Sequence, residues 1–221
     1  MLSVFFVYFN DYSDHSAQSS RIYHAVSLSL VLAGLGVRCY TVGTTPEGTS
    51  GRNTDEQVAE RLNTTGIYSL VRHPLYLGNY LIWVGLVVFV ESPVFILVFS
   101  LLYWIYYERI MLAEEAYIAG KFGDAFIQWS NRVPAFIPRF SGFERPVVHF
   151  SIKPALRGEY SGLIAIAVSY LFLEIIIGWV RFGRMAVGDR LLYICCAIVA
   201  VSLVLRTLKH HSRLLNRQYP S

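Results

Sequence analysis

Residues 74–107 read PLYLGNYLIWVGLVVFVESPVFILVFSLLYWIYY, two apolar runs that meet at the triplet Glu91-Ser92-Pro93. Ser92 is a favoured N-cap residue, and Pro93 suits the first position of a helix, where its missing N–H costs nothing. No barrel-like alternation occurs, and backbone groups in lipid must pair within the chain. The stretch therefore predicts an antiparallel pair of membrane helices, over about 74–90 and 93–107.

The rest of the 221-residue chain has the same apolar character. Hydrophobic residues make up 54% of it and charged residues 15%, and the mean hydropathy is +0.44. A soluble globule of this size could not bury so much apolar surface. Further spans are predicted over 22–42, 160–180 and 191–205, while 1–9 fits either the end of another span or an interfacial anchor. The predicted fold class is an all-α, polytopic transmembrane helical bundle.

Lys and Arg residues are divided unequally between the two ends of such a bundle. When the spans alternate in direction, 15 of the 19 lie at the end that carries the loops 41–73 and 108–158. The positive-inside rule places that end in the cytoplasm. The net charge is +4, but no basic run interleaved with aromatic residues occurs, so we expect no nucleic-acid partner. Cys39, Cys195 and Cys196 show no metal-ligand spacing, so we predict no metal site.

Polar residues gather where the span 74–90 begins. If the helix includes Arg72, then Arg72, Tyr76, Asn79 and Trp83 lie at i, i+4, i+7 and i+11, on one face. A cation, a phenol, a carboxamide and an indole would then point together into one end of the membrane. Such residues are also common at headgroup level, so an interfacial anchor is the alternative.

A second polar group follows the span 93–107, in YYERIMLAEEAYIAGKFGDAFIQW (106–129). Interpreted as an interfacial helix, this stretch has an apolar stripe through Met111 and Ile118, and Glu115 falls on that stripe with Glu114 on its flank. A carboxylate on a buried face is costly unless it meets a cation or strong donors. The pair is therefore a candidate binding site, and a solvated run of charges is the alternative.

Prolines mark a third segment, NRVPAFIPR (131–139). Pro134 and Pro138 prevent a continuous helix and predict an extended strip along the membrane surface. Arg132 and Arg139 on this strip either bind an anionic headgroup or are ordinary positive-inside charges.

These groups, in this order and spacing, resemble the isoprenylcysteine carboxyl methyltransferase and phospholipid methyltransferase superfamily. The shared elements, within about residues 63–140, are Arg72-His73-Pro74-Leu75-Tyr76-Leu77-Gly78, Glu114-Glu115, Phe122-Gly123 followed by Phe126 and Trp129, and the strip from Pro134 to Pro138. Phe126 and Trp129 stand where the family usually has tyrosines. The stretches 44–53 and 62–66 resemble bacterial members, which implies a bacterial inner membrane.

The resemblance implies an integral, multi-pass membrane enzyme that binds S-adenosylmethionine between the two motifs, on the cytoplasmic side. The cofactor contacts that it implies are His73, Tyr76, Gly78, Glu114 and Glu115, and it places Arg72 near the reacting centre. Carboxylates would bind the cofactor's ammonium group, and aromatic faces its sulfonium. Residues 1–150 would form the methyltransferase core, and 151–221 a C-terminal transmembrane hairpin.

The expected acceptor is a membrane lipid or a lipidated molecule, with Asn79, Trp83, Arg132 and Arg139 as candidate contacts. No general base stands near the motifs, which favours a carboxylate or phosphate oxygen over an amine. A nicotinamide-dependent sterol or steroid reductase is an alternative, because some carry a similar Arg-His-Pro-x-Tyr segment, but adjacent carboxylates would repel a nucleotide phosphate. A non-catalytic, lipid-binding membrane scaffold is a third possibility. The pattern carries no information on oligomeric state.

Overall fold

The computed structural model describes residues 2–10, 16–46, 61–185 and 187–211. Every regular element in that part of the chain is a helix, as the sequence predicts. The elements are α1 (Leu2–Phe9), α2 (Ala17–Thr44), the 3-10 helix η1 (Gly66–Ser69), α3 (Pro74–Val88), α4 (Pro93–Phe122), α5 (Asp124–Ser130), α6 (Ile152–Phe182) and α7 (Asp189–His211).

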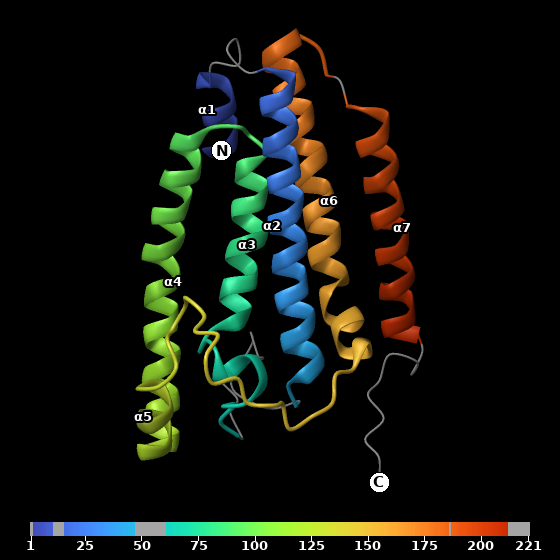
Figure 1. Cartoon of the computed structure of the whole chain (residues 1–221). Coiled ribbons are helices and arrows are strands. Elements are labelled where there is room, and N and C mark those ends of the chain that lie inside the picture. Colours follow the sequence, from blue (N-terminus) through green and yellow to red (C-terminus); the bar gives the residue numbers. More distant parts are fainter. Residues whose placement is uncertain (1, 11–15, 47–60, 186, 212–221) are drawn as a thin grey trace.

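The long helices lie side by side, and successive ones run in opposite directions (Figure 1). Four stretches are long and apolar enough to cross a membrane, namely α2, α4, α6 and residues Asp189–Lys209 of α7. Helix α3 is apolar too, but it has only 15 residues. The spans predicted over 22–42, 160–180 and 191–205 fall inside α2, α6 and α7. The polytopic helical fold is thereby confirmed.

The turn between α3 and α4 forms as predicted. The Ser92 hydroxyl accepts a hydrogen bond from the Phe95 amide at 3.4 Å, and Pro93 begins α4. Glu91, with a φ of 62°, lies in the left-handed region, and its carboxylate accepts a hydrogen bond from the Ser20 hydroxyl at 2.9 Å. A buried acid at the turn thus finds its partner on α2, which fixes the hairpin to the neighbouring helix.

Helix α4 corrects one prediction. The sequence suggested a span over 93–107 followed by a separate interfacial helix, but one helix of 30 residues runs from Pro93 to Phe122. After Pro93 the stretch holds no proline, and its one glycine, Gly120, is tolerated inside the helix, so nothing breaks it. The break comes at Gly123, whose φ of 53° suits a residue without a Cβ, and α5 starts directly after it.

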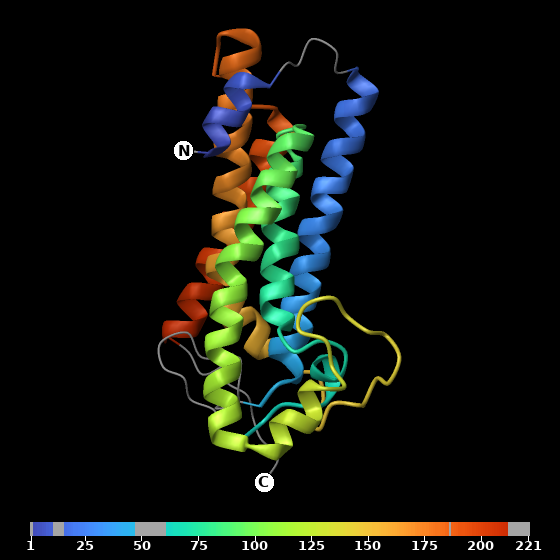
Figure 2. The ribbon, with the colours of Figure 1, turned by 90° about the vertical axis from the view of Figure 1, so that its left-hand side faces the viewer.

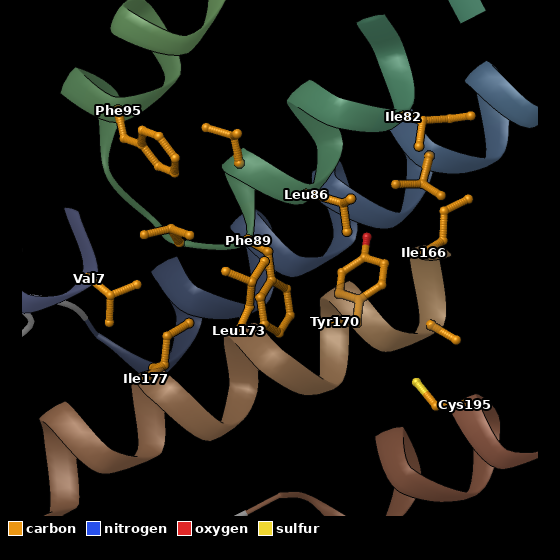
Figure 3. Close-up of a cluster of buried hydrophobic side chains, with 14 residues drawn as sticks. Val7, Ile82, Leu86, Phe89, Phe95, Ile166, Tyr170, Leu173, Ile177 and Cys195 are labelled. Carbon is orange, nitrogen blue, oxygen red and sulfur yellow. The ribbon is translucent and has the colours of Figure 1, made fainter. Parts of the chain in front are cut away.

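Apolar side chains from α1, α2, α3, α4, α6 and α7 form the main core (Figure 3). The Phe89 ring at the end of α3 meets the Tyr170 ring of α6 edge to face, with centroids 5.1 Å apart. The hydroxyl oxygens of Tyr170 and Ser27 are 2.7 Å apart, so the polar atom in this core has a partner. Helix α1 joins the same core through Val7, which is fully buried.

Helices α2 and α3 pack closely because glycines face each other. A Cβ atom on Gly34 would lie 2.6 Å from the carbonyl oxygen of Gly78, and one on Gly78 would lie 2.6 Å from Cγ of Arg38. Arg38 therefore passes directly over Gly78. Its Nη1 donates to Oδ1 of Asn79 at 2.6 Å, and its Nε and Nη2 donate to the carboxylate of Glu159 on α6 at 2.7 and 2.8 Å.

We expect this ion pair to hold α6 against the rest of the bundle. Glu159→Ala should lower the free energy of unfolding by about 3 kcal/mol, because removing one partner leaves a largely buried cation uncompensated. Thermal unfolding of the detergent-solubilised protein measures the effect, with Glu108→Gln as a control on an exposed acid of α4. Equal melting temperatures for the two variants would contradict a structural role for the pair.

Candidate active site

The residues of the three sequence motifs meet at the end of the bundle opposite the α3–α4 turn, here called the motif end. It consists of the C-terminal ends of α2 and α4, η1, α5, the start of α3 and the segment 131–151 (Figures 1 and 2). The predicted extended strip runs beside the residues that lead into α3. The amides of Arg72 and His73 donate to the carbonyls of Pro134 and Ala135 at 2.9 and 3.1 Å. This backbone pairing fixes the main-chain positions of Arg72 and His73.

The Arg72 guanidinium is the centre of the site. It grips Glu115 with two bonds, from Nε to Oε1 at 2.8 Å and from Nη2 to Oε2 at 3.2 Å. Its Nη1 donates to the backbone carbonyls of Ser130 and Val133 at 2.7 and 2.8 Å. Four of its five N–H groups therefore bind the protein itself, and one N–H of Nη2 is left.

The His73 imidazole lies between the two glutamates of α4. Its Nε2 is 2.8 Å from Oε1 of Glu115, and its Nδ1 is 3.7 Å from Oε2 of Glu114, which is beyond hydrogen-bond range. The Tyr76 hydroxyl donates to that same Glu114 oxygen at 3.1 Å. Glu115 thus has a cation and an imidazole as partners, whereas Glu114 has one phenol hydrogen bond.

Aromatic rings stand beside the glutamates. The Tyr76 ring contacts the Tyr107 ring with centroids 5.3 Å apart, and Tyr107 stacks on Tyr103 at 4.0 Å. The Tyr103 hydroxyl donates to the backbone carbonyl of Tyr76 at 2.8 Å, which ties α4 to the first turn of α3. The site therefore presents both carboxylates and aromatic faces, the two groups that bind organic cations in water-excluded places.

A small apolar cluster joins the elements that surround the site. It contains Tyr68 of η1, Ile118 of α4, Phe126 and Trp129 of α5, and Val133 of the strip. The Trp129 indole donates to the Tyr68 carbonyl at 3.1 Å. The cluster holds η1, α4 and α5 together, and it places the carbonyls that Arg72 binds.

Five of the predicted site residues thus come together, namely Arg72, His73, Tyr76, Glu114 and Glu115. The predicted common face of Arg72, Tyr76, Asn79 and Trp83 is wrong: Arg72 precedes the helix, Tyr76 bonds to α4, Asn79 bonds to α2, and Trp83 is 45% exposed. Tyr76 and Asn79 differ by about 60° around the helix, which is enough to give them different neighbours.

The remaining predicted contacts lie outside this network. Gly78 faces Arg38 and the backbone of α2. Arg132 is exposed, and its Nε donates to the carbonyl of Gln128, one turn back, at 3.2 Å. Arg139 is exposed as well, and its Nε donates to the Ser141 hydroxyl at 2.9 Å.

The pair of Arg38 and Glu159 was missed from the sequence. Arg38 is the one Lys or Arg in the predicted span 22–42, and a charge within a membrane span usually has a partner, so this part of the signal was present. Glu159 lies two residues after Arg157, just before the predicted span 160–180, and gave no such signal. What the sequence did not show is that residues 121 positions apart would meet. The pair reaches Asn79, one turn along α3 from Tyr76, so the C-terminal helices contact the helix that carries the site.

A cavity of about 430 Å³ opens in the same layer of the molecule. Tyr68 and Phe122 line it on the side of the apolar cluster, and the other lining residues are Thr44, Thr45, Pro46, Arg61, Leu62, Asn63, Thr64, Thr65 and Val147. Hydroxyl and amide groups share this lining with apolar side chains, which suits an organic ligand with both polar and apolar parts. Within the described ranges, no group of three or more His, Cys, Asp or Glu side chains is placed to hold a metal ion.

Comparison with known proteins identifies relatives of this chain. A family model described as phospholipid methyltransferase matches residues 22–125. The nickel-cobalt-cadmium resistance protein NccN of Alcaligenes xylosoxydans xylosoxydans is 32% identical over 73% of this chain and 72% of its own length. The match to protein-S-isoprenylcysteine O-methyltransferase of Schizosaccharomyces pombe is 37% identical, over 40% of this chain. That to protein-S-isoprenylcysteine O-methyltransferase B of Arabidopsis thaliana is 34% identical, over 35% of it.

The match spans only 36% and 40% of the lengths of these two methyltransferases. No solved structure matches the chain. The family model covers α2, α3, α4 and the start of α5, which hold the Arg-His-Pro segment and the paired glutamates. The chain therefore belongs to the superfamily of membrane methyltransferases that comprises the phospholipid and isoprenylcysteine carboxyl methyltransferases.

Proposed function

We propose that the protein is an integral membrane methyltransferase that uses S-adenosylmethionine to methylate a lipid or a lipid-linked acceptor. One contact network carries this proposal. It joins the beginning of α3 to the C-terminal part of α4, through Arg72, His73, Tyr76, Glu114 and Glu115. It combines anionic and aromatic groups at the edge of a membrane bundle, in a chain of a methyltransferase superfamily. When bound, S-adenosylmethionine supplies a methyl group on a sulfonium, which an acceptor oxygen takes by displacing the neutral thioether.

The two glutamates would have different roles at the site. Glu115 is held by Arg72 and His73, so its charge is already balanced by the protein. Glu114 has only the Tyr76 hydroxyl within hydrogen-bond range, and its side chain is 18% exposed. Glu114 is therefore the better partner for the ammonium group of the donor, and Glu115 holds the site in shape. Tyr76 stacks on His73 and Tyr107 stacks on Tyr103, and the other face of each ring would be the one to contact the sulfonium.

The neighbourhood of the site favours an acceptor that is already anionic. His73 is the imidazole of the network, but its side chain is 5% exposed and is enclosed by the two glutamates, so it cannot easily reach an acceptor's proton. A carboxylate or phosphate oxygen needs no general base. The remaining N–H of Arg72 would orient such an oxygen while the other four hold the guanidinium in place.

The motif end would face the cytoplasm. Of the 19 Lys and Arg residues, 15 belong to this end when the helices alternate, although Arg52, Arg213 and Arg217 fall outside the described residues. Cytoplasmic loops of membrane proteins carry such an excess. Residues 1–150 would then supply the methyltransferase core, and the hairpin of α6 and α7 would be attached to it through Arg38 and Glu159.

Replacing each glutamate in turn should distinguish a residue that only binds the methyl donor from one that also stabilises the folded protein. Glu115→Gln should weaken S-adenosylmethionine binding by roughly 1.5–3 kcal/mol and should also lower the melting temperature, because Arg72 loses its charged partner. Glu114→Gln should weaken binding by a similar amount while leaving the melting temperature nearly unchanged. Isothermal titration calorimetry on detergent-purified protein measures the affinities. A nicotinamide adenine dinucleotide phosphate is titrated separately, because the alternative reductase function predicts that it binds. Binding of that dinucleotide in place of S-adenosylmethionine would refute the proposed donor.

Arg72→Lys tests the role of the guanidinium. Lysine keeps the charge but lacks the planar fork, so it cannot bind the carboxylate and two carbonyls at once and has no N–H left for an acceptor. Turnover should therefore fall much more than donor affinity. Arg206→Lys, a change at an exposed arginine of α7, is the matched control and should leave both nearly unchanged. Equal losses of turnover and donor affinity in Arg72→Lys would instead place Arg72 among the donor contacts.

A further inference from the structure

The segment 136–150, here called the apolar loop, connects α5 to α6 and exposes large apolar side chains. Ile137, Phe140 and Val147 are each about four-fifths exposed, at 79%, 82% and 79%. Phe143 and Phe150 are about half exposed, at 49% and 52%. Five such side chains within 15 residues form far more exposed apolar surface than a water-facing loop normally carries.

The apolar loop has a fixed backbone. The Arg139 amide donates to the Leu70 carbonyl at 2.9 Å, close to where the strip pairs with the start of α3. The Glu144 amide donates to the Ser69 hydroxyl at 3.0 Å, and its carbonyl accepts from the Gly66 amide at 2.9 Å. These bonds tie the loop to η1 and to Leu70 directly after it, while Ile137 and Phe140 remain about four-fifths exposed.

The loop also lies where a bilayer would reach it. It folds back beside the lower part of α3 and stands away from the bundle, as the yellow segment of Figure 2 shows. Neighbouring helices α2 and α4 are candidate membrane spans, so the loop is next to the edge of the hydrocarbon layer. Apolar side chains at that depth gain by burial in lipid.

The charged residues of the apolar loop indicate which lipids it would contact. Arg139 and Arg145 are exposed between the apolar side chains, and Glu144 is the one acid of the loop. Arginine beside aromatic residues is typical of the layer where headgroups meet acyl chains. Each cation near an anionic membrane surface contributes about 1 kcal/mol of attraction.

We propose that the apolar loop is a membrane-binding element. Ile137, Phe140 and Phe143 insert into the headgroup–acyl boundary of the leaflet at the motif end, and Arg139 and Arg145 bind anionic lipid headgroups. The inference does not depend on methyl transfer.

Spin-label accessibility tests the insertion. With Cys39, Cys195 and Cys196 replaced by alanine, a nitroxide is attached through Ile137→Cys or Phe140→Cys, and through Gln128→Cys as a control on the exposed face of α5. In nanodiscs of phosphatidylcholine and phosphatidylglycerol, the labels at 137 and 140 should collide readily with oxygen and rarely with a water-soluble nickel chelate. The label at 128 should show the reverse.

Each other result at positions 137 and 140 overturns the proposal. Access of the nickel chelate equal to that at 128 would mean that the loop lies in water. Protection from both reagents would mean a protein contact, such as a second copy of the chain. If the cysteine-free protein does not fold, quenching of tryptophan by brominated lipids in Phe140→Trp, compared with Gln128→Trp and the unchanged protein, gives the same answer.

The headgroup contact has its own test. Adding phosphatidylglycerol to phosphatidylcholine nanodiscs should reduce access of the nickel chelate to the label at 140. Arg139→Gln combined with Arg145→Gln should abolish this lipid dependence while oxygen access stays high. No response to phosphatidylglycerol in the protein with both arginines would refute anionic headgroup binding.

Discussion

The motif end depends on one guanidinium. Arg72 joins the segment that enters α3 to Glu115 of α4 and to two backbone carbonyls of the turn that follows α5. These groups come from three parts of the chain, and each would be costly to bury without a donor. A planar fork with several N–H groups satisfies all of them from one point, which neither lysine nor histidine can do. The site therefore owes its shape to the same bonds that make it stable.

A second arginine has the corresponding place on the other side of α3. Arg38 binds Glu159 of α6 and Asn79 of α3, about one turn along α3 from Tyr76. Helix α3 is thus fixed by polar contacts on two sides, towards α4 at the site and towards α2 and α6 deeper in the bundle. Glycines at the α2–α3 contact bring the backbones close enough for this arrangement. Inside a membrane, paired polar groups give helix contacts a register that apolar packing alone does not specify.

Local patterns in the sequence were enough to predict much of this structure. The Ser92-Pro93 turn and the apolar spans follow from capping and hydropathy. The family resemblance implied that the Arg-His-Pro segment and the paired glutamates form one site, but the bond between Arg72 and Glu115 was not predicted. Two features depended on tertiary packing instead. The orientation of α3, with Gly78 packed against α2, decides which neighbours Tyr76 and Asn79 meet, and no periodicity shows it. The pairing of Arg38 with Glu159 joins distant parts of the chain, so hydropathy reveals a charge inside the span 22–42 but does not identify its partner.

The short length of α3 has a consequence for the membrane around the protein. Its 15 residues rise about 22 Å, less than the roughly 30 Å of a typical hydrocarbon core. In a bilayer of that thickness, irregular backbone next to α3 would lie at hydrocarbon depth, which is tolerated only where its polar groups are paired. The amides of Arg72 and His73 are paired with the proline strip. A leaflet that thinned at this flank to match α3 would bring headgroups closer to the paired glutamates, and acyl-chain length in the host membrane would then affect how deep the site lies.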